Sequence, residues 1–192
     1  NANDIAGMSI NNSFYVAVDK NNIFDNAGRA IATSGGAFNN ITNNNISFNR
    51  NDGMVLGSTN NSLIESNIIF DNKDAGIVPI DLINLTVLRN NITFARRIAF
   101  LLLQNVTNSN FSYNIIINTT NSSGSQVAAN PARGISIQVN SHNNTAAYND
   151  IIGSGQGIII TNDAADVMKE NNIHHNSIRD GNNSGIYLTS DA

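Results

Sequence analysis

Aspartate and histidine side chains at repeated positions are the groups in this sequence best suited to acid–base chemistry. Asp25 and Asp71 occupy equivalent positions of a recurring six-residue motif, Phe48 lies at that position in the copy between them, and His175 continues the series. Carboxylates and an imidazole on one surface could supply the general acid and base that cleave a polysaccharide. Two repeats correspond to about 10 Å if each repeat advances by one strand spacing. Because inverting glycosidases hold their carboxylates roughly 6.5–9.5 Å apart, we favour exposed aspartates at strand ends and keep catalysis as the alternative.

The other groups that could bind a metal or a cofactor are scattered. His174 and His175 are adjacent, and His142 stands alone. Adjacent residues of a strand point to opposite faces, so the first two histidines are not expected to line one site. The chain has no cysteine, no His-Glu-x-x-His motif and no aspartates at the spacing of a calcium loop. We therefore predict no metal site and no cofactor.

Charged residues gather just after several copies of the motif. Mixed signs in neighbouring repeats favour a ladder of ion pairs along one edge, in which each pair contributes little stability. The alternative is a surface that grips an acidic polysaccharide, because arginine binds carboxylates in a bidentate manner. The candidates for that contact are Arg50, Lys73, Arg96 and Arg97, and the whole group consists of Arg29, Arg50, Asp52, Lys73, Asp74, Arg96 and Arg97.

Composition excludes several classes of protein. The 192 residues carry a net charge of −4 with only ten lysines and arginines, which argues against a nucleic-acid partner. No run of 18 apolar residues is present, so no membrane-spanning segment is predicted. Charged residues make up 12% of the chain, and 38 asparagines supply much of its polarity instead. Asparagine is a poor residue for helix interiors because its amide competes with the backbone for hydrogen bonds.

The asparagines belong to an internal repeat. The motif Asn-x-Ile-x-x-Asn or a degenerate copy of it begins at positions 21, 44, 67, 90 and 113, at a constant interval, and again at 149 and 171. The wider step from 113 to 149 indicates an insertion, which we place in the loop Thr119–Arg133. A second, shorter insertion is expected near Arg179–Ser184. Repeats of about 20–50 residues are typical of solenoids.

Each unit carries three short apolar segments, which predict three strands per coil. The segments are the isoleucine of the motif, a run such as Gly76-Ile77-Val78, and a third column that includes Ile41 and Ile64. Stacked coils then form an all-β, right-handed, single-stranded parallel β-helix with about seven coils of ~23 residues and three parallel sheets. Asparagines at motif positions one and six should stack in amide ladders. One buried column is expected to contain Ile23, Ile46, Ile69, Ile92, Ile115, Ile151 and Ile173.

The motif followed by Gly-Ile/Val-x-Ile/Leu resembles the repeat of the pectate-lyase-like superfamily, and in particular its NosD-like and carbohydrate-binding group. The resemblance covers essentially the whole chain and implies a single β-helix domain over residues 1–192. Extrapolating the repeat backwards places a partial first coil in residues 1–20. It implies less about function, because the superfamily includes lyases, hydrolases, epimerases, phage tail spikes and surface proteins. The Asp-Pro-His-Asp-like signature expected of alginate epimerases is absent. In composition, the chain also resembles archaeal sheath and S-layer proteins of methanogens.

The two ends of the predicted solenoid suggest assembly. Met8 and Ile10 lie in the first predicted strand, and Ile186, Tyr187 and Leu188 lie in the last, so both strand edges could pair with another copy. We therefore expect an extracellular structural protein of the cell surface or sheath that stacks end to end with itself. The alternatives are a fragment of a polysaccharide lyase, hydrolase or epimerase, or a carbohydrate-binding module. Twelve Asn-x-Ser/Thr sequons permit an extracellular or cell-surface location.

Overall fold

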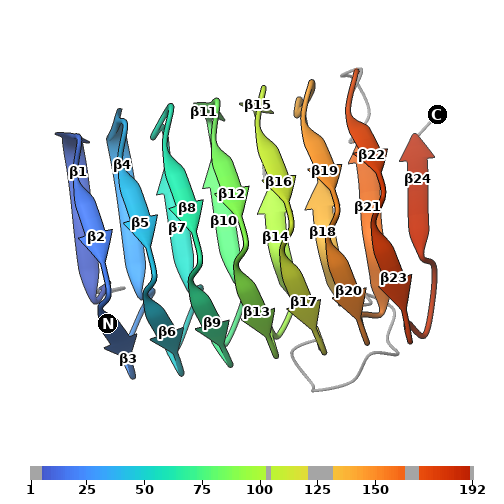
Figure 1. Cartoon of the computed structure of the whole chain (residues 1–192), viewed down its shortest axis with the longest axis horizontal. Helices are drawn as coiled ribbons and strands as arrows, with labels where there is room; N and C mark the ends of the chain where they lie inside the picture. The colour runs from blue at the N-terminus through green and yellow to red at the C-terminus, as the bar shows by residue number, and fades with distance from the viewer. Residues whose placement is uncertain (1–5, 103–104, 121–131, 163–168, 191–192) are drawn as a thin grey trace.

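The chain is a parallel β-solenoid whose coils follow one another along a single axis. The computed structural model describes residues 6–102, 105–120, 132–162 and 169–190. Within these ranges all paired strands run parallel, and successive coils lie side by side from the N-terminal to the C-terminal end (Figure 1). No helix in the described part is long and apolar enough to cross a membrane. The predicted all-β solenoid with about seven coils and three main sheets is confirmed.

Each of seven successive coils contributes one strand to each of three sheets, which we name A, B and C, and sheet A has an eighth strand at its C-terminal edge. Sheet A contains β1 (Met8–Phe14), β4 (Ile31–Ala37), β7 (Met54–Gly57), β10 (Ile77–Ile80), β14 (Ile98–Leu102), β18 (Arg133–Ile137), β21 (Gln156–Asn162) and β24 (Ile186–Ser190). Sheet B contains β2 (Ala17–Asp19), β5 (Asn40–Thr42), β8 (Leu63–Glu65), β12 (Thr86–Leu88), β16 (Asn110–Ser112), β19 (Thr145–Ala147) and β22 (Asn172–His174). Sheet C contains β3 (Asn22–Phe24), β6 (Asn45–Ser47), β9 (Ile68–Phe70), β13 (Asn91–Thr93), β17 (Ile115–Ile117), β20 (Asp150–Ile152) and β23 (Ser177–Arg179). A short pair, β11 (Leu82–Ile83) and β15 (Val106–Thr107), adds a small fourth sheet.

The core is a set of apolar columns that run along the axis, because the middle residue of each short strand points inward. In sheet C the inward column is confirmed for five of the seven isoleucines predicted, and Ile116 and Ile178 occupy the other two places. The full column is Ile23, Ile46, Ile69, Ile92, Ile116, Ile151 and Ile178.

The prediction was wrong for Ile115 and Ile173. Ile115 points outward and is 43% exposed, whereas Ile173 belongs to sheet B, where it pairs with Ala146. The reason is a change of coil length. Asn67 and Asn90, which bond to each other in adjacent coils, are 23 residues apart, whereas Asn90 and Asn114 are 24 residues apart. The extra residue shifts the apolar pattern of the following strand by one position.

The same effect displaces the later coils. Ala146 pairs with Ile173 across a wider interval than the regular one, so additional residues enter before β22. Ile98 pairs with Arg133, which places a much longer segment between β17 and β18. Most of the loop predicted there, residues 121–131, lies outside the described residues.

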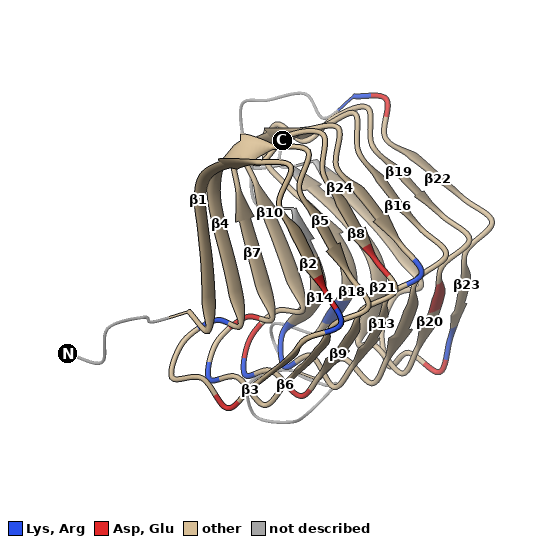
Figure 2. Ribbon diagram, turned by 60° about the vertical axis from the view of Figure 1, so that its left-hand side comes forward, with Lys and Arg blue, Asp and Glu red and all other residues tan. Residues whose placement is uncertain are grey.

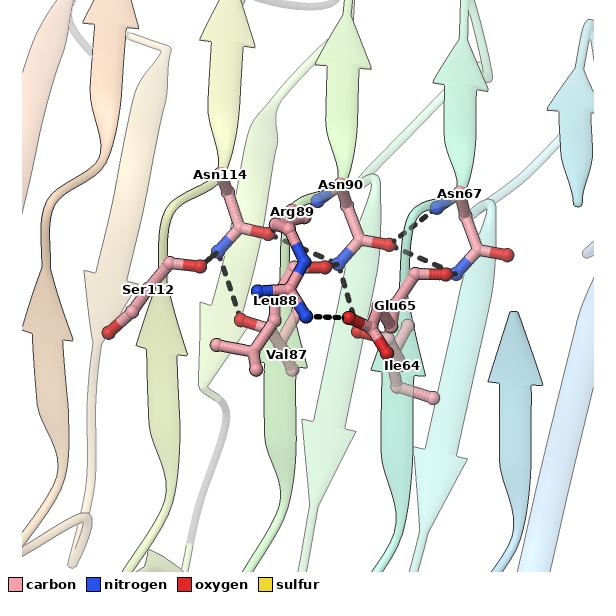
Figure 3. Close-up of polar contacts among 9 residues, drawn as sticks. All are labelled: Ile64, Glu65, Asn67, Val87, Leu88, Arg89, Asn90, Ser112 and Asn114. Carbon is pink, nitrogen blue, oxygen red and sulfur yellow. Dashed lines mark hydrogen bonds and ion pairs between the residues drawn. The ribbon is translucent and has the colours of Figure 1, made fainter. Parts of the chain in front are cut away.

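Asparagine ladders line the corners between the sheets. At the corner between sheets B and C, the side-chain oxygen of each asparagine accepts hydrogen bonds from the backbone and the amide group of its equivalent in the preceding coil (Figure 3). This ladder consists of Asn21, Asn44, Asn67, Asn90, Asn114, Asn149 and Asn176. The predicted ladder is confirmed, except that Asn114 and Asn176 replace positions 113 and 171.

A second ladder lies at the corner between sheets C and A. Asn26 bonds to Asn49, and Asn49 bonds to Asn72, through the same pair of contacts. The amide ladder at motif position six is thus confirmed over three coils. Later in the chain, hydroxyl groups link adjacent coils at this corner. The Ser154 hydroxyl donates to the Thr119 hydroxyl oxygen at 3.0 Å.

Candidate functional site

The corner between sheets C and A carries the densest charge on the molecule. We call it the charged corner and define it as residues 26–29, 49–52, 72–75 and 95–98 together with Arg133. Six of the ten lysines and arginines lie here: Arg29, Arg50, Lys73, Arg96, Arg97 and Arg133. Blue and red segments are gathered in the turns beside β3 and β6 (Figure 2). The whole chain has a net charge of −4, so these six cations form a local concentration of positive charge on a protein that is negative overall.

Ion pairs join neighbouring coils along this corner. The Arg29 Nε lies 3.4 Å from Asp52 Oδ2, and the Arg97 Nε lies 3.0 Å from Asp74 Oδ1. The predicted ladder is therefore confirmed for these residues. The two arginine side chains remain 35% and 55% exposed, so each pair adds little to stability.

Arg50, Lys73 and Arg96 form a second feature, which we call the cation column. They occupy equivalent positions, 23 residues apart, in three successive coils. The Arg50 and Lys73 backbone N–H groups donate to the Asn26 and Asn49 carbonyls of the preceding coils, whereas the Arg96 N–H donates to the Asp74 carbonyl. Arg96 is bound to Asp71, whose Oδ1 accepts from the Arg96 Nε and Nη2 at 3.1 and 3.0 Å. Arg50 and Lys73 are exposed and form no ion pair with any described residue. Two adjacent coils therefore present unneutralised cations to solvent.

Aromatic side chains border the cation column on the side of sheet C. We name Phe24, Phe48, Phe70 and Phe94 the phenylalanine strip. The rings of Phe48 and Phe94 both pack edge-on to that of Phe70, at centroid distances of 5.2 and 5.6 Å. Phe48 is 51% exposed and Phe94 is 41% exposed. The strip was not predicted, because Phe24 and Phe70 end their strands whereas Phe48 and Phe94 follow theirs, so no single position of the repeat carries phenylalanine in every coil.

Asp25 and Asp71 lie in the same corner column as Phe48 and Phe94, as expected from the motif. All four have left-handed backbone conformations, with φ between 45° and 57°, where the chain bends out of sheet C. Asp25 and Asp71 are two coils apart with Phe48 between them, and Asp71 is held by Arg96. The structure does not bring these two carboxylates together with His175.

His175 lies at a different corner, between sheets B and C. Its ring stacks on Tyr148 at 4.9 Å, and Tyr148 stacks on Tyr113 at 4.9 Å, so that the three rings form their own ladder. The Nδ1 atoms of His174 and His175 lie 2.7 Å apart, which corrects the expectation that the two side chains point away from each other. The reason is the bend at His175, where φ is 53° and strand β22 has ended.

Two cavities flank the charged corner. One, of about 330 Å³, opens on the side of sheet C and is lined by Phe70, Asp71, Phe94, Arg96 and Thr120. The other, of about 290 Å³, opens on the outer face of sheet A and is lined by Arg29, Asn51, Asp52, Val55, Asp74, Val78, Ile80 and Arg97. The first cavity combines aromatic rings with the ion pair of Arg96 and Asp71, and the second combines ion pairs with an aliphatic floor.

Asp52 is the buried carboxyl group of the second cavity. It is 7% exposed, its Oδ1 accepts the Ala75 N–H at 3.1 Å, and its Oδ2 faces Arg29. Burial raises the pKa of Asp52, and the negative charge of Asp74 acts in the same direction. Burial also lowers the pKa of Arg133, helped by the neighbouring charge of Arg97. On the sheet A side of the corner, burial thus disfavours the charged forms of Asp52 and Arg133. Arg50 and Lys73 of the cation column are instead exposed to water.

Comparison with known proteins identifies the family. The sequence model of the family described as "Right handed beta helix region" matches residues 2–127. The chain belongs to the right-handed β-helix family. The predicted resemblance to right-handed β-helix repeats is thereby confirmed. No curated protein matches the sequence of this β-helix.

Solved structures of the periplasmic alginate epimerase AlgG are similar to this β-helix. A mutant of AlgG superimposes with a TM-score of 0.70 at 18% sequence identity, covering 97% of this chain and 48% of that one. A second AlgG structure gives a TM-score of 0.43 at 16% identity, covering 88% of this chain and 47% of that one. This β-helix therefore spans about half the length of these structures, and at such identity the first likeness shows a shared fold. In the described residues, no three His, Cys, Asp or Glu side chains come together as they would around a metal ion.

Proposed function

We propose that this β-helix binds an acidic polysaccharide along its charged corner. The observation that carries the proposal is the cation column, in which Arg50 and Lys73 are exposed on adjacent coils without a carboxylate partner among the described residues. Like charges stacked in register repel each other, and an anionic ligand relieves that repulsion. The description of AlgG as a periplasmic alginate epimerase supports a ligand of this class and a location outside the cytoplasm.

The spacing of the cations fits a polymer with regularly repeated anions. Equivalent residues of adjacent coils are separated by one strand spacing, about 4.8 Å. A sugar unit of an extended polysaccharide advances the chain by a similar distance. A chain that lies parallel to the solenoid axis and carries one carboxylate per sugar could therefore place successive carboxylates near Arg50, Lys73 and Arg96.

Replacing both exposed cations tests this function. In Arg50→Gln/Lys73→Gln, binding of alginate should weaken about tenfold or more, because charge-assisted hydrogen bonds are lost. The loss should shrink as salt is raised. Lys20→Gln is the control, because Lys20 is 78% exposed but pairs with Asp19 at another corner. Isothermal titration calorimetry measures the affinities. Equal alginate affinity in the double variant and the wild type would refute the proposal. If the wild-type protein shortens alginate chains during incubation, the result would favour the enzymatic alternative with Asp25 and Asp71.

End-to-end assembly is the second candidate function, and it rests on the exposed side chains of β24. Ile186 and Leu188 pair with Ile158 and Ile160 of the core columns, yet they are 53% and 67% exposed, and Tyr187 is 42% exposed. At the opposite edge of sheet A, β1 places Ile10 in the core and Met8 against it. A coil of a second copy would cover β24 and satisfy its outer backbone groups.

Assembly predicts a sedimentation coefficient that rises with protein concentration. Leu188→Lys should reduce this dependence, because it places a charge where the next coil would pack. Ile83→Lys is the control, because Ile83 is also exposed but lies away from the edge. A wild-type chain that sediments as a monomer at all concentrations would contradict the structural role.

A further inference from the structure

We propose that the sugar rings of the bound polysaccharide lie on the phenylalanine strip, so that the outer face of sheet C beside the charged corner is the binding surface. This inference rests on the proposed function and adds to it the face that is used and the part of the ligand that is recognised. The cation column would hold the anionic groups, and the strip would hold the rings that carry them.

Exposed apolar side chains are concentrated on this face. Phe24 is 62% exposed and Ile68 is 54% exposed, in addition to Phe48, Phe94 and Ile115. Phe48, Phe70 and Phe94 contact one another through their rings and form a continuous aromatic row. Exposed apolar surface of this kind often marks a binding site. The strip runs parallel to the cation column, because both follow the solenoid axis through the same coils.

The chemistry of the strip suits a sugar chain. The face of an aromatic ring carries partial negative charge, which attracts the C–H groups on the less polar face of a pyranose ring. Phe70 lies between Phe48 and Phe94. The 330 Å³ cavity, whose lining includes Phe70 and Phe94, gives one sugar ring a recess beside the ion pair of Arg96 and Asp71. A ligand with carboxylates and sugar rings can contact both rows at once.

The outer face of sheet A offers less to such a ligand. The Arg29 and Arg97 side chains in its cavity are paired with Asp52 and Asp74. Its apolar floor consists of Val55, Val78 and Ile80, without an aromatic ring. A polyanion on that side would have to displace carboxylates from both arginines. On the sheet C side only Arg96 is held by a carboxylate, that of Asp71, whereas Arg50 and Lys73 are exposed and form no ion pair with a described residue.

The test compares two ligands and two variants of the full chain by calorimetry. Alginate oligosaccharides carry both sugar rings and carboxylates, whereas polyglutamate carries repeated carboxylates without sugar rings. In Phe48→Ala/Phe94→Ala, affinity for alginate should fall about tenfold, at low and at high salt alike, since stacking is insensitive to salt. Polyglutamate affinity should be unchanged. Tyr15→Ala, which removes a 77% exposed ring at a different corner, should bind both ligands as the wild type does.

The outcomes separate this inference from the function on which it rests. If the phenylalanine variant binds alginate as the wild type does while Arg50→Gln/Lys73→Gln has lost binding, the strip is not the sugar surface and the inference fails alone. If neither variant changes alginate affinity, the proposed function fails as well.

Affinity for alginate should also rise with oligosaccharide length until about four sugars span the coils of the strip. An affinity that peaks at a single sugar would overturn the inference.

Discussion

An Ile69→Asp variant is expected not to fold. Ile69 is 1% exposed in a central coil and lies between Ile46 and Ile92 in the inward column of sheet C. A carboxylate at this position would have apolar neighbours above and below and no described cation within the core. Burying an unpaired charge costs several kcal/mol even after its pKa shifts, and this is comparable to the whole stability of a typical domain, about 5–15 kcal/mol.

The neighbouring residue provides a matched control. Ile68 is 54% exposed on the outer face of the same strand, β9, so Ile68→Asp should keep the fold and change the midpoint of thermal unfolding only slightly. Circular dichroism of the two variants measures the difference. A cooperative unfolding transition for Ile69→Asp near the temperature of the wild type would show that the assignment of the inward face is wrong.

The period of the sequence predicted the architecture because every coil uses the same apolar positions. The prediction of individual columns failed where a coil changes length. Around Ile115 three consecutive isoleucines follow Asn114, so the apolar pattern fits either of two registers. The better signal was Asn114 itself, because a ladder asparagine comes directly before β17, as Asn90 comes directly before β13. The polar corner was thus more informative about register than the apolar core.

The candidate site was predicted in part. Charges in the turn between sheets C and A could be found because those turn residues repeat in step with the motif, and their pairing across coils follows from that register. The phenylalanine strip could not be found in this way, since its members alternate between two positions. The position of His175 was also missed, because additional residues before β22 shift the last coil relative to the motif.

The asparagine ladder should be as important for stability as the core, and Asn67→Ala measures its contribution. The Asn67 Oδ1 accepts the Asn44 N–H and side-chain amide at 2.9 and 3.0 Å. Its Nδ2 donates to the Glu65 carbonyl and to Asn90 Oδ1 (Figure 3). It also donates to the Ile41 carbonyl of the preceding coil. Alanine would leave several buried polar groups without partners, and we expect a loss of about 3 kcal/mol or more.

Two further asparagines calibrate this prediction. Asn72 is as buried as Asn67, but its Nδ2 makes one longer bond, at 3.3 Å to the Ile46 carbonyl, so Asn72→Ala should cost roughly 1–2 kcal/mol. Asn84 is exposed and its side-chain amide donates to Asn61, so Asn84→Ala should have little effect, because water replaces the lost partner. Urea unfolding of the three variants gives the free energies. Equal losses at Asn67 and Asn84 would mean that the turns are held by the packing of the isoleucine columns, and that the buried amides add no more than exposed ones do.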